Sequence, residues 1–215
     1  MNIELKIIEN LRVEFLELFD DVNCSEEDVQ KLFEKIIKAY TSKDRYYHNL
    51  NHIQNFLKFI TKNQNNIQIV KTLKMAVWFH DVIYDTKVQD NEEKSALYAN
   101  KSLKELHVTP EIISQVELLI LATKTHESFS KNKDSEIFLD GDLLILGSSE
   151  ETFDRYAESI RKEYSWVSDE KYRVGRIKVL EDFLKRDRIY FTDETYDKFE
   201  KYARSNIKRE IKSLK

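Results

Sequence analysis

Glycine and proline are scarce in this chain, and their scarcity limits the folds it can adopt. Only 3 Gly and 1 Pro occur in 215 residues. A β-sandwich or an α/β fold needs many turns, which these residue types commonly supply. Hydrophobic residues make up 41% of the chain, which is enough for a core. The sequence is also rich in Leu, Ile, Lys and Glu, which suit helices, so it predicts an all-α protein.

Apolar spacing and capping signals predict a series of helices. They are expected over residues 3–20, 25–40, 50–60, 75–84, 92–106 and 110–126, and after starts near Ser149, Ser168 and Thr192. Polar loops are expected over residues 85–91 and 129–134. No repeat or linker interrupts this pattern, so we expect a single helical domain over residues 1–215. Its motif-bearing core covers about residues 40–147, and C-terminal helices cover about 149–213.

Charge and hydropathy limit the expected partners. The net charge of −4 gives no general attraction to nucleic acid, and the basic tail over residues 201–215 is amphipathic, as in a packed helix. No apolar stretch reaches the roughly 18 residues of a membrane span. Cys24 is the single cysteine, and the first residues lack the pattern of a signal peptide. We expect a cytoplasmic protein that binds neither nucleic acid nor membrane, and we leave open a homo-oligomer.

Histidines and aspartates gather near apolar segments. The elements are His48-x-x-x-His52, His80-Asp81, Asp85, His126 and Asp140-x-Asp142. Ionisable groups beside apolar helices are costly to bury unless something pairs with them, and a metal ion would do so. Imidazole nitrogen and carboxylate oxygen together suit divalent metals. The sequence therefore predicts a metal site, with manganese, iron, nickel, magnesium or zinc as candidates.

Each element alone also has a structural explanation. His48 and His52 alone could form a surface pair at positions i and i+4. Asp140 could cap a helix N-terminus, with Asp142 as an acid in its first turn. We interpret His107 as structural, because it would stabilise a helix C-terminus. His126 could have the same role. The combined set is harder to explain in this way.

The order of these residues resembles the HD-domain metal-dependent phosphohydrolases. The stretch from His80 to Thr86 is similar to the corresponding stretch of the guanosine tetraphosphate hydrolases, except that Tyr84 replaces a Glu. A bacterial family of predicted HD-superfamily phosphohydrolases is closer and covers residues 40–205. It shares Tyr47-His48-Asn49-Leu50-x-His52-Ile53, Trp78-Phe79-His80-Asp81-x-x-Tyr84-Asp85, Asn91-Glu92-x-x-Ser95-Ala96, Thr123-x-x-His126, Phe138-Leu139-Asp140-x-Asp142-Leu143-x-x-Leu146-Gly147, Arg161-x-Glu163-Tyr164 and Gly175-Arg176-x-x-Val179-Leu180.

The resemblance implies an HD-domain-like orthogonal helical bundle with an ion between helices. By position, His80, Asp81 and Asp142 carry over as metal ligands. The first ligand is His48 or His52, and His52 is favoured because it lies more surely on a helix.

The expected function is a metal-dependent phosphohydrolase that acts on a small phosphate ester or nucleotide. A metal-activated water would attack the phosphorus, and Asp85 is the candidate base with Glu92 behind it. His126 and Arg176, and more weakly Arg161 and Arg173, are candidates for contacts with phosphate, although the surface of an amphipathic helix explains Arg161 and Arg173 better. Two alternatives are a di-iron oxygenase of HD type and a nucleotide sensor without turnover.

Overall fold

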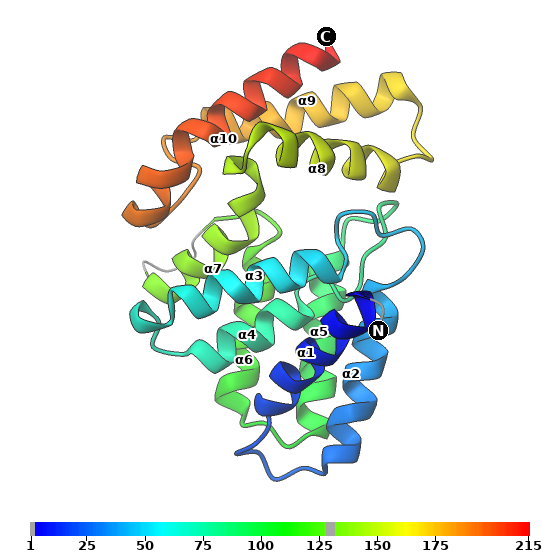
Figure 1. Cartoon of the computed structure of the whole chain (residues 1–215), viewed down its shortest axis with the longest axis vertical. Coiled ribbons are helices and arrows are strands. Elements are labelled where there is room, and N and C mark those ends of the chain that lie inside the picture. The colour runs from blue at the N-terminus through cyan, green and yellow to red at the C-terminus, as the bar shows by residue number, and fades with distance from the viewer. Residues whose placement is uncertain (1–2, 128–131) are drawn as a thin grey trace. The chain divides into compact units, whose positions relative to one another are not determined.

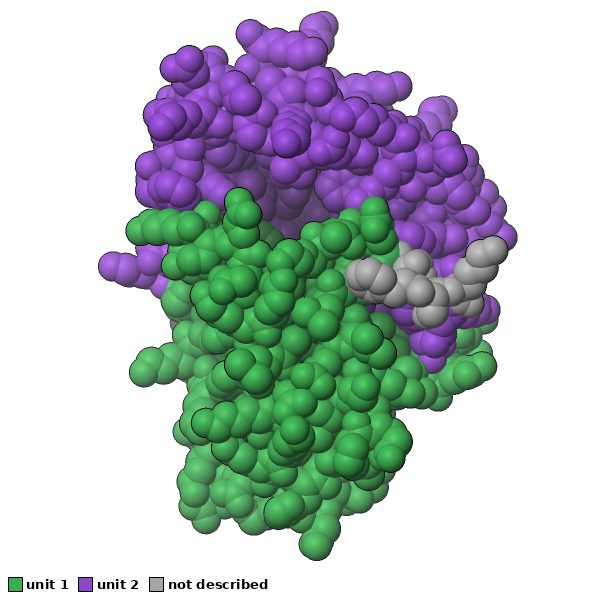
Figure 2. Space-filling model, turned by 180° about the vertical axis from the view of Figure 1, so that it is seen from behind, with its two compact units in different colours: residues 1–42, 48–127 green, residues 43–47, 128–215 purple. Residues whose placement is uncertain are grey.

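The computed structural model describes residues 3–127 and 132–215, and every regular element in these ranges is helical (Figure 1). The all-α prediction is confirmed. Contacts group the chain into two compact units, coloured separately in Figure 2. Unit 1 holds residues 1–42 and 48–127, and unit 2 holds residues 43–47 and 128–215. The single domain expected from the sequence stays a prediction.

Unit 1 contains six α-helices and one short 3-10 helix in its described part. They are α1 (Ile3–Glu17), α2 (Glu26–Tyr40), α3 (Leu50–Lys62), η1 (Gln64–Asn66), α4 (Val70–Phe79), α5 (Asn91–Glu105) and α6 (Pro110–Ala122). Caps explain the starts: the Ser25 side chain accepts the N–H of Asp28, and Pro110 occupies the first turn of α6. The predicted helix over residues 75–84 is wrong at its end, because α4 stops at Phe79.

Helix α4 lies in the interior of unit 1. It packs against α3, α5 and α6, and residues 75–79 are 0% exposed. Phe15 of α1 and Phe33 of α2 meet the Trp78 ring edge-on. Burial on this scale stabilises each large side chain by about 2–3 kcal/mol. The chain therefore leaves α4, at Phe79, from a tightly packed position.

Unit 2 contains the remaining described helices. They are α7 (Lys133–Leu143), η2 (Leu144–Gly147), α8 (Glu150–Glu163), α9 (Asp169–Lys185) and α10 (Asp193–Leu214). The starts predicted near Ser149, Ser168 and Thr192 are confirmed, since each residue is the N-cap of its helix. Of the loop expected over residues 129–134, residues 129–131 lie outside the described residues, and α7 already begins at residue 133.

A close approach of two helical segments in unit 2 requires glycine. A Cβ atom on Gly147 would lie 2.7 Å from the Cβ of Phe199 and 2.8 Å from the hydroxyl of Tyr190. Real side chains essentially never approach so closely. Gly147 therefore allows η2 to pack against α10, and nothing lies within 4 Å of the equivalent position on Gly175. No helix in the described ranges combines the length and the apolar character needed to cross a membrane.

Candidate metal centre

The first turn of α3 carries His52. The side chain of Asn49 caps this helix by accepting the N–H of Asn51 at 2.9 Å. On the inner face of α3, Ile53 and Phe56 are fully buried, and His52 beside them is 6% exposed. An imidazole in such surroundings needs a polar partner.

The end of α4 carries the two other polar groups. His80 is the C-cap of α4 and donates its backbone N–H to the carbonyl of Ala76 at 2.9 Å. The His80 residue is 1% exposed, whereas the Asp81 side chain keeps 16% of its surface exposed. The pair therefore combines one deeply buried imidazole with one carboxylate that solvent reaches.

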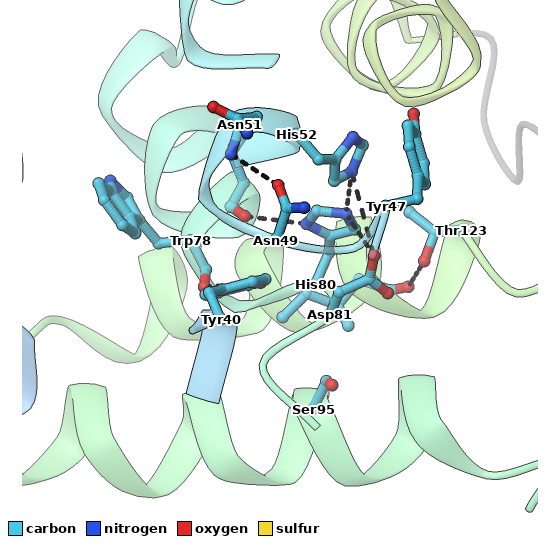
Figure 3. A network of polar contacts seen from close by, with 12 residues as sticks. Tyr40, Tyr47, Asn49, Asn51, His52, Trp78, His80, Asp81, Ser95 and Thr123 are labelled. Carbon is cyan, nitrogen blue, oxygen red and sulfur yellow. Dashed lines mark hydrogen bonds and ion pairs between the residues drawn. The ribbon is translucent and has the colours of Figure 1, made fainter. Parts of the chain in front are cut away.

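The side chains of His52, His80 and Asp81 point toward one another (Figure 3). Their Nε2, Nε2 and carboxylate atoms all lie within 4.8 Å of one another, which makes them a group that could hold a metal ion. The separations are 3.0 Å from His52 Nε2 to His80 Nε2, 3.1 Å from His80 Nε2 to Asp81 Oδ2, and 4.0 Å from His52 Nε2 to Asp81 Oδ2. The circle through three atoms at these separations has a radius of about 2.0 Å, close to metal–ligand bond lengths.

The other ring nitrogen of His80 fixes its protonation pattern. Nδ1 lies 2.8 Å from the carbonyl oxygen of Val77, which can only accept, so Nδ1 carries a proton. In the neutral ring, Nε2 then presents its lone pair to His52 and Asp81. A backbone carbonyl behind a ligating histidine is the usual arrangement in metal sites. Without an ion, the Nε2–H of His52 would donate to the same lone pair.

Two side chains of α5 hold the loop that follows Asp81. The Ser95 hydroxyl accepts the N–H of Ile83 at 3.1 Å and donates to its carbonyl at 3.2 Å. The Asn91 amide likewise accepts the N–H of Asp85 at 3.0 Å and donates to its carbonyl at 2.9 Å. The sequence singled out the motif that contains Asn91 and Ser95 without giving either residue a role. A serine on the buried face of a polar helix was the sequence signal that could have identified Ser95.

The two candidate bases have different surroundings. Asp85 is exposed, and its Oδ1 accepts the N–H of Lys87 at 2.9 Å, a contact typical of a turn. Glu92, in the first turn of α5, is partly buried, and burial raises the pKa of its carboxyl. The negative charge of Asp81 raises that pKa further. The pKa of Glu92 therefore depends on the charge of the metal group.

His48 has a different environment from His52. It precedes α3, and its ring lies against Tyr84 with the centroids 4.2 Å apart and the planes at 31°. Its centroid is 6.0 Å from that of the His52 ring. Among the described residues, the group within 4.8 Å contains His52 and not His48.

Asp140 and Asp142 lie in unit 2, inside α7. The alternative that they begin a helix is wrong, because α7 starts at Lys133. Asp140 is 0% exposed and accepts the backbone N–H groups of Phe191 and Thr192 at 2.7 and 3.0 Å. Asp140 thus supports the start of α10, and Asp142 as a metal ligand stays a prediction.

Phosphate contacts of Arg176 and Arg161 stay a prediction, and both arginines contact other groups of unit 2. Arg176 donates through Nε and Nη2 to the two carboxylate oxygens of Glu210, at 2.8 and 3.0 Å. Arg161 donates to the carbonyls of Tyr164 and Val167 at 2.8 and 3.0 Å. These contacts give both guanidinium groups structural roles, which explains their presence in the motifs.

His126 follows the end of α6. Its backbone has a positive φ of 48°, and its N–H donates to the carbonyl of Ala122 at 2.9 Å. His107 has the same left-handed backbone after α5, with a φ of 60°. Both residues therefore adopt the left-handed backbone common after the end of a helix, and the phosphate contact of His126 stays a prediction.

Comparisons with known proteins add no identification. No family model, curated protein or solved structure matches the chain. The likeness to HD phosphohydrolases is therefore a resemblance in motifs.

Proposed function

We propose that this chain is a metal-dependent phosphohydrolase with an HD-like helical bundle, acting on a small phosphate ester or nucleotide. The observation that supports it most is the convergence of His52, His80 and Asp81 around a point about 2.0 Å from each ligand atom. The resemblance supplies phosphate as the substrate class. With Cys24 as the single cysteine, we expect the protein to act in the cytoplasm.

The ligand roles follow from the geometry of unit 1. His52 and His80 provide neutral nitrogen ligands, and Asp81 provides a charged oxygen ligand and remains open to solvent on one side. A bound divalent ion lowers the pKa of a coordinated water and polarises a phosphoryl oxygen. His52 is the proposed first ligand in preference to His48. Asp142 completes the proposed set by resemblance alone.

Glu92 is the proposed base, in preference to Asp85. A carboxyl whose pKa is raised by burial holds a proton more readily at neutral pH than an exposed one. Glu92 has this property, whereas Asp85 is exposed and supports the turn at Lys87. In the proposed reaction, the proton of the attacking water passes to the carboxylate of Glu92, and the leaving alcohol takes a proton from solvent.

Elemental analysis combined with a substrate panel tests the proposal. Protein purified without chelator should contain a divalent metal, and Asp81→Ala should remove both the metal and the hydrolysis of phosphate esters or nucleotides. Turnover should be screened with manganese, iron, nickel, magnesium and zinc. A protein that takes up none of these metals would overturn the proposal.

Two other outcomes point to the alternatives. Metal binding with nucleotide affinity and no turnover would favour a sensor. Two irons per chain with consumption of oxygen would favour an oxygenase. In either case, hydrolysis of phosphate esters would be rejected.

A further inference from the structure

His48 lies near the metal group without belonging to it. The ring centroids of His48 and His52 are 6.0 Å apart, and the two residues are four positions apart in the sequence. Asn49, which caps α3, fixes the start of the helix between them. His48 does not belong to the group of His52, His80 and Asp81, but its ring is a close neighbour of the His52 ring within that group.

The position of Tyr84, against which the His48 ring lies, is fixed from both sides. Tyr84 stands between Ile83 and Asp85, and each of these neighbours has its N–H and its carbonyl bound by one side chain of α5. Four hydrogen bonds thus hold the backbone around Tyr84. The ring centroids of Tyr84 and His48 lie 4.2 Å apart at 31°, so Tyr84 restricts the orientation of the imidazole.

We propose that His48, held by Tyr84, binds the phosphoryl oxygens of the substrate at the metal centre. This inference rests on the proposed function. When one oxygen of a phosphoryl group binds an ion, its other oxygens lie roughly 4 Å from that ion, and a donor must come within about 3 Å of them. The His48 ring lies on the segment that leads into α3, and its centroid is 6.0 Å from that of the ligating His52 ring, a separation that one phosphoryl group bound at the ion can span.

The chemistry of the pair suits an anion. An imidazole N–H that donates to a phosphoryl oxygen forms a charge-assisted hydrogen bond, which is stronger than a neutral one. The contact with Tyr84 restricts the ring and so lowers the entropy lost on binding. His48 would therefore bind the phosphoryl group while His52, in the first turn of α3, binds the ion.

Binding of inorganic phosphate to the manganese-loaded protein tests this division of roles. His48→Ala should keep the manganese stoichiometry of the wild type and weaken phosphate binding by about tenfold to a hundredfold, as expected for one charged hydrogen bond. Tyr84→Ala should weaken phosphate binding, and Tyr84→Phe, which keeps the ring against His48, should weaken it less. His107→Asn is the matched control, because asparagine tolerates the positive φ of that position.

Each contrary outcome overturns the inference. If His48→Ala loses manganese as His52→Ala does, His48 is a metal ligand. If His48→Ala keeps the wild-type phosphate affinity, or if the loaded wild type binds no phosphate, His48 makes no such contact. His48→Gln retains a donor and should recover part of the affinity, which separates this role from a folding defect. Failure of the proposed function is distinct: phosphate would bind, but no substrate of the panel would turn over.

Discussion

The Nδ1 atom of His80 lies 2.8 Å from the carbonyl oxygen of Val77, in the last turn of α4. The final carbonyls of a helix lack partners within the helix. Here the Tyr40 hydroxyl donates to the Trp78 carbonyl at 3.2 Å, and the Val82 N–H donates to the Phe79 carbonyl at 3.1 Å. Three of the last carbonyls of α4 thus have partners, and one of them, that of Val77, also orients the ring of His80.

Loss of either imidazole should abolish metal binding. We expect His80→Ala and His52→Ala each to lower the affinity for manganese by about a hundredfold or more, since even the loss of a group behind a ligand costs up to about that factor. Isothermal titration calorimetry measures the affinity directly. Adding manganese should also raise the Tm of the wild type and leave that of both variants unchanged.

A histidine at a helix end provides the control for this prediction. His126→Asn, at a position with a φ of 48°, should bind manganese as the wild type does. Wild-type affinity in His52→Ala would show that the His52–His80 contact is a hydrogen bond within the protein and that the ion, if any, is bound elsewhere.

Glu92 and Asp85 can be separated by matched amide substitutions. Glu92→Gln should retain manganese and lower kcat by about a hundredfold or more, the scale expected for a general base. Asp85→Asn should keep most of the activity, because its Oδ1 supports a turn and an amide oxygen can accept the same N–H. Steady-state kinetics on the confirmed substrate, with metal content measured in parallel, gives the answer. The reverse pattern would return the role of base to Asp85.

The pH dependence should report the same group. A base must be deprotonated to act, so kcat/KM should fall as the pH drops through the pKa of Glu92. Burial raises that pKa and the charge of a bound divalent ion lowers it, so the pH of the fall shows which effect is larger at Glu92. Glu92→Gln should remove this limb of the profile. A limb that persists in Glu92→Gln belongs to another group.

Local signals in the sequence were sufficient to predict where α2, α8 and α10 begin. Ser25, Ser149 and Thr192 each cap a helix through the side chain, and this chemistry involves only neighbouring residues. The apolar residues 75–79 likewise indicated a buried helix. These signals depend on contacts over one helical turn, which a sequence pattern records.

Contacts between distant segments were not predictable in the same way. The end of α4 at Phe79 depends on Tyr40 and on the α5 side chains that hold the following loop. Asp140 appeared to begin a helix, but its partners lie at positions 191 and 192. A sequence pattern relates residues that are close together along the chain, whereas these hydrogen-bond partners come into contact only in the folded protein. His52 could be favoured over His48 because the start of α3 had a local signal.

Gly147 and Gly175, two of the three glycines of unit 2, should respond in opposite ways to alanine. In Gly147→Ala, the new Cβ would meet Phe199 and Tyr190 at less than 3 Å, so we expect a loss of about 1–3 kcal/mol from overpacking. Gly175 lies within α9 with nothing within 4 Å, so Gly175→Ala should stabilise by about 0.5–1 kcal/mol. Urea denaturation measures both. Equal effects of the two substitutions would contradict the close approach at Gly147.

Arg176 and Glu210 should each destabilise the fold when the other is removed. Both side chains are only 8% exposed, and the guanidinium also lies 5.2 Å from the centroid of the Tyr156 ring. Removing one partner leaves a buried charge without its counterion, so Arg176→Met or Glu210→Leu alone should cost about 3–5 kcal/mol. The double variant should lose less than either single variant, because no charge then remains buried. A double-mutant cycle in urea measures this coupling.

The same variants decide between a structural and a substrate-binding role for Arg176. If the guanidinium serves only Glu210, the double variant should hydrolyse substrate with a near-normal KM. If Arg176 contacts phosphate, KM should rise in the double variant even though its stability has recovered. The bidentate geometry at 2.8 and 3.0 Å uses the Nε and Nη2 donors on Glu210, and Nη1 lies 3.3 Å from the Tyr156 hydroxyl. With each guanidinium nitrogen engaged in this way, we expect KM to stay unchanged and only stability to respond.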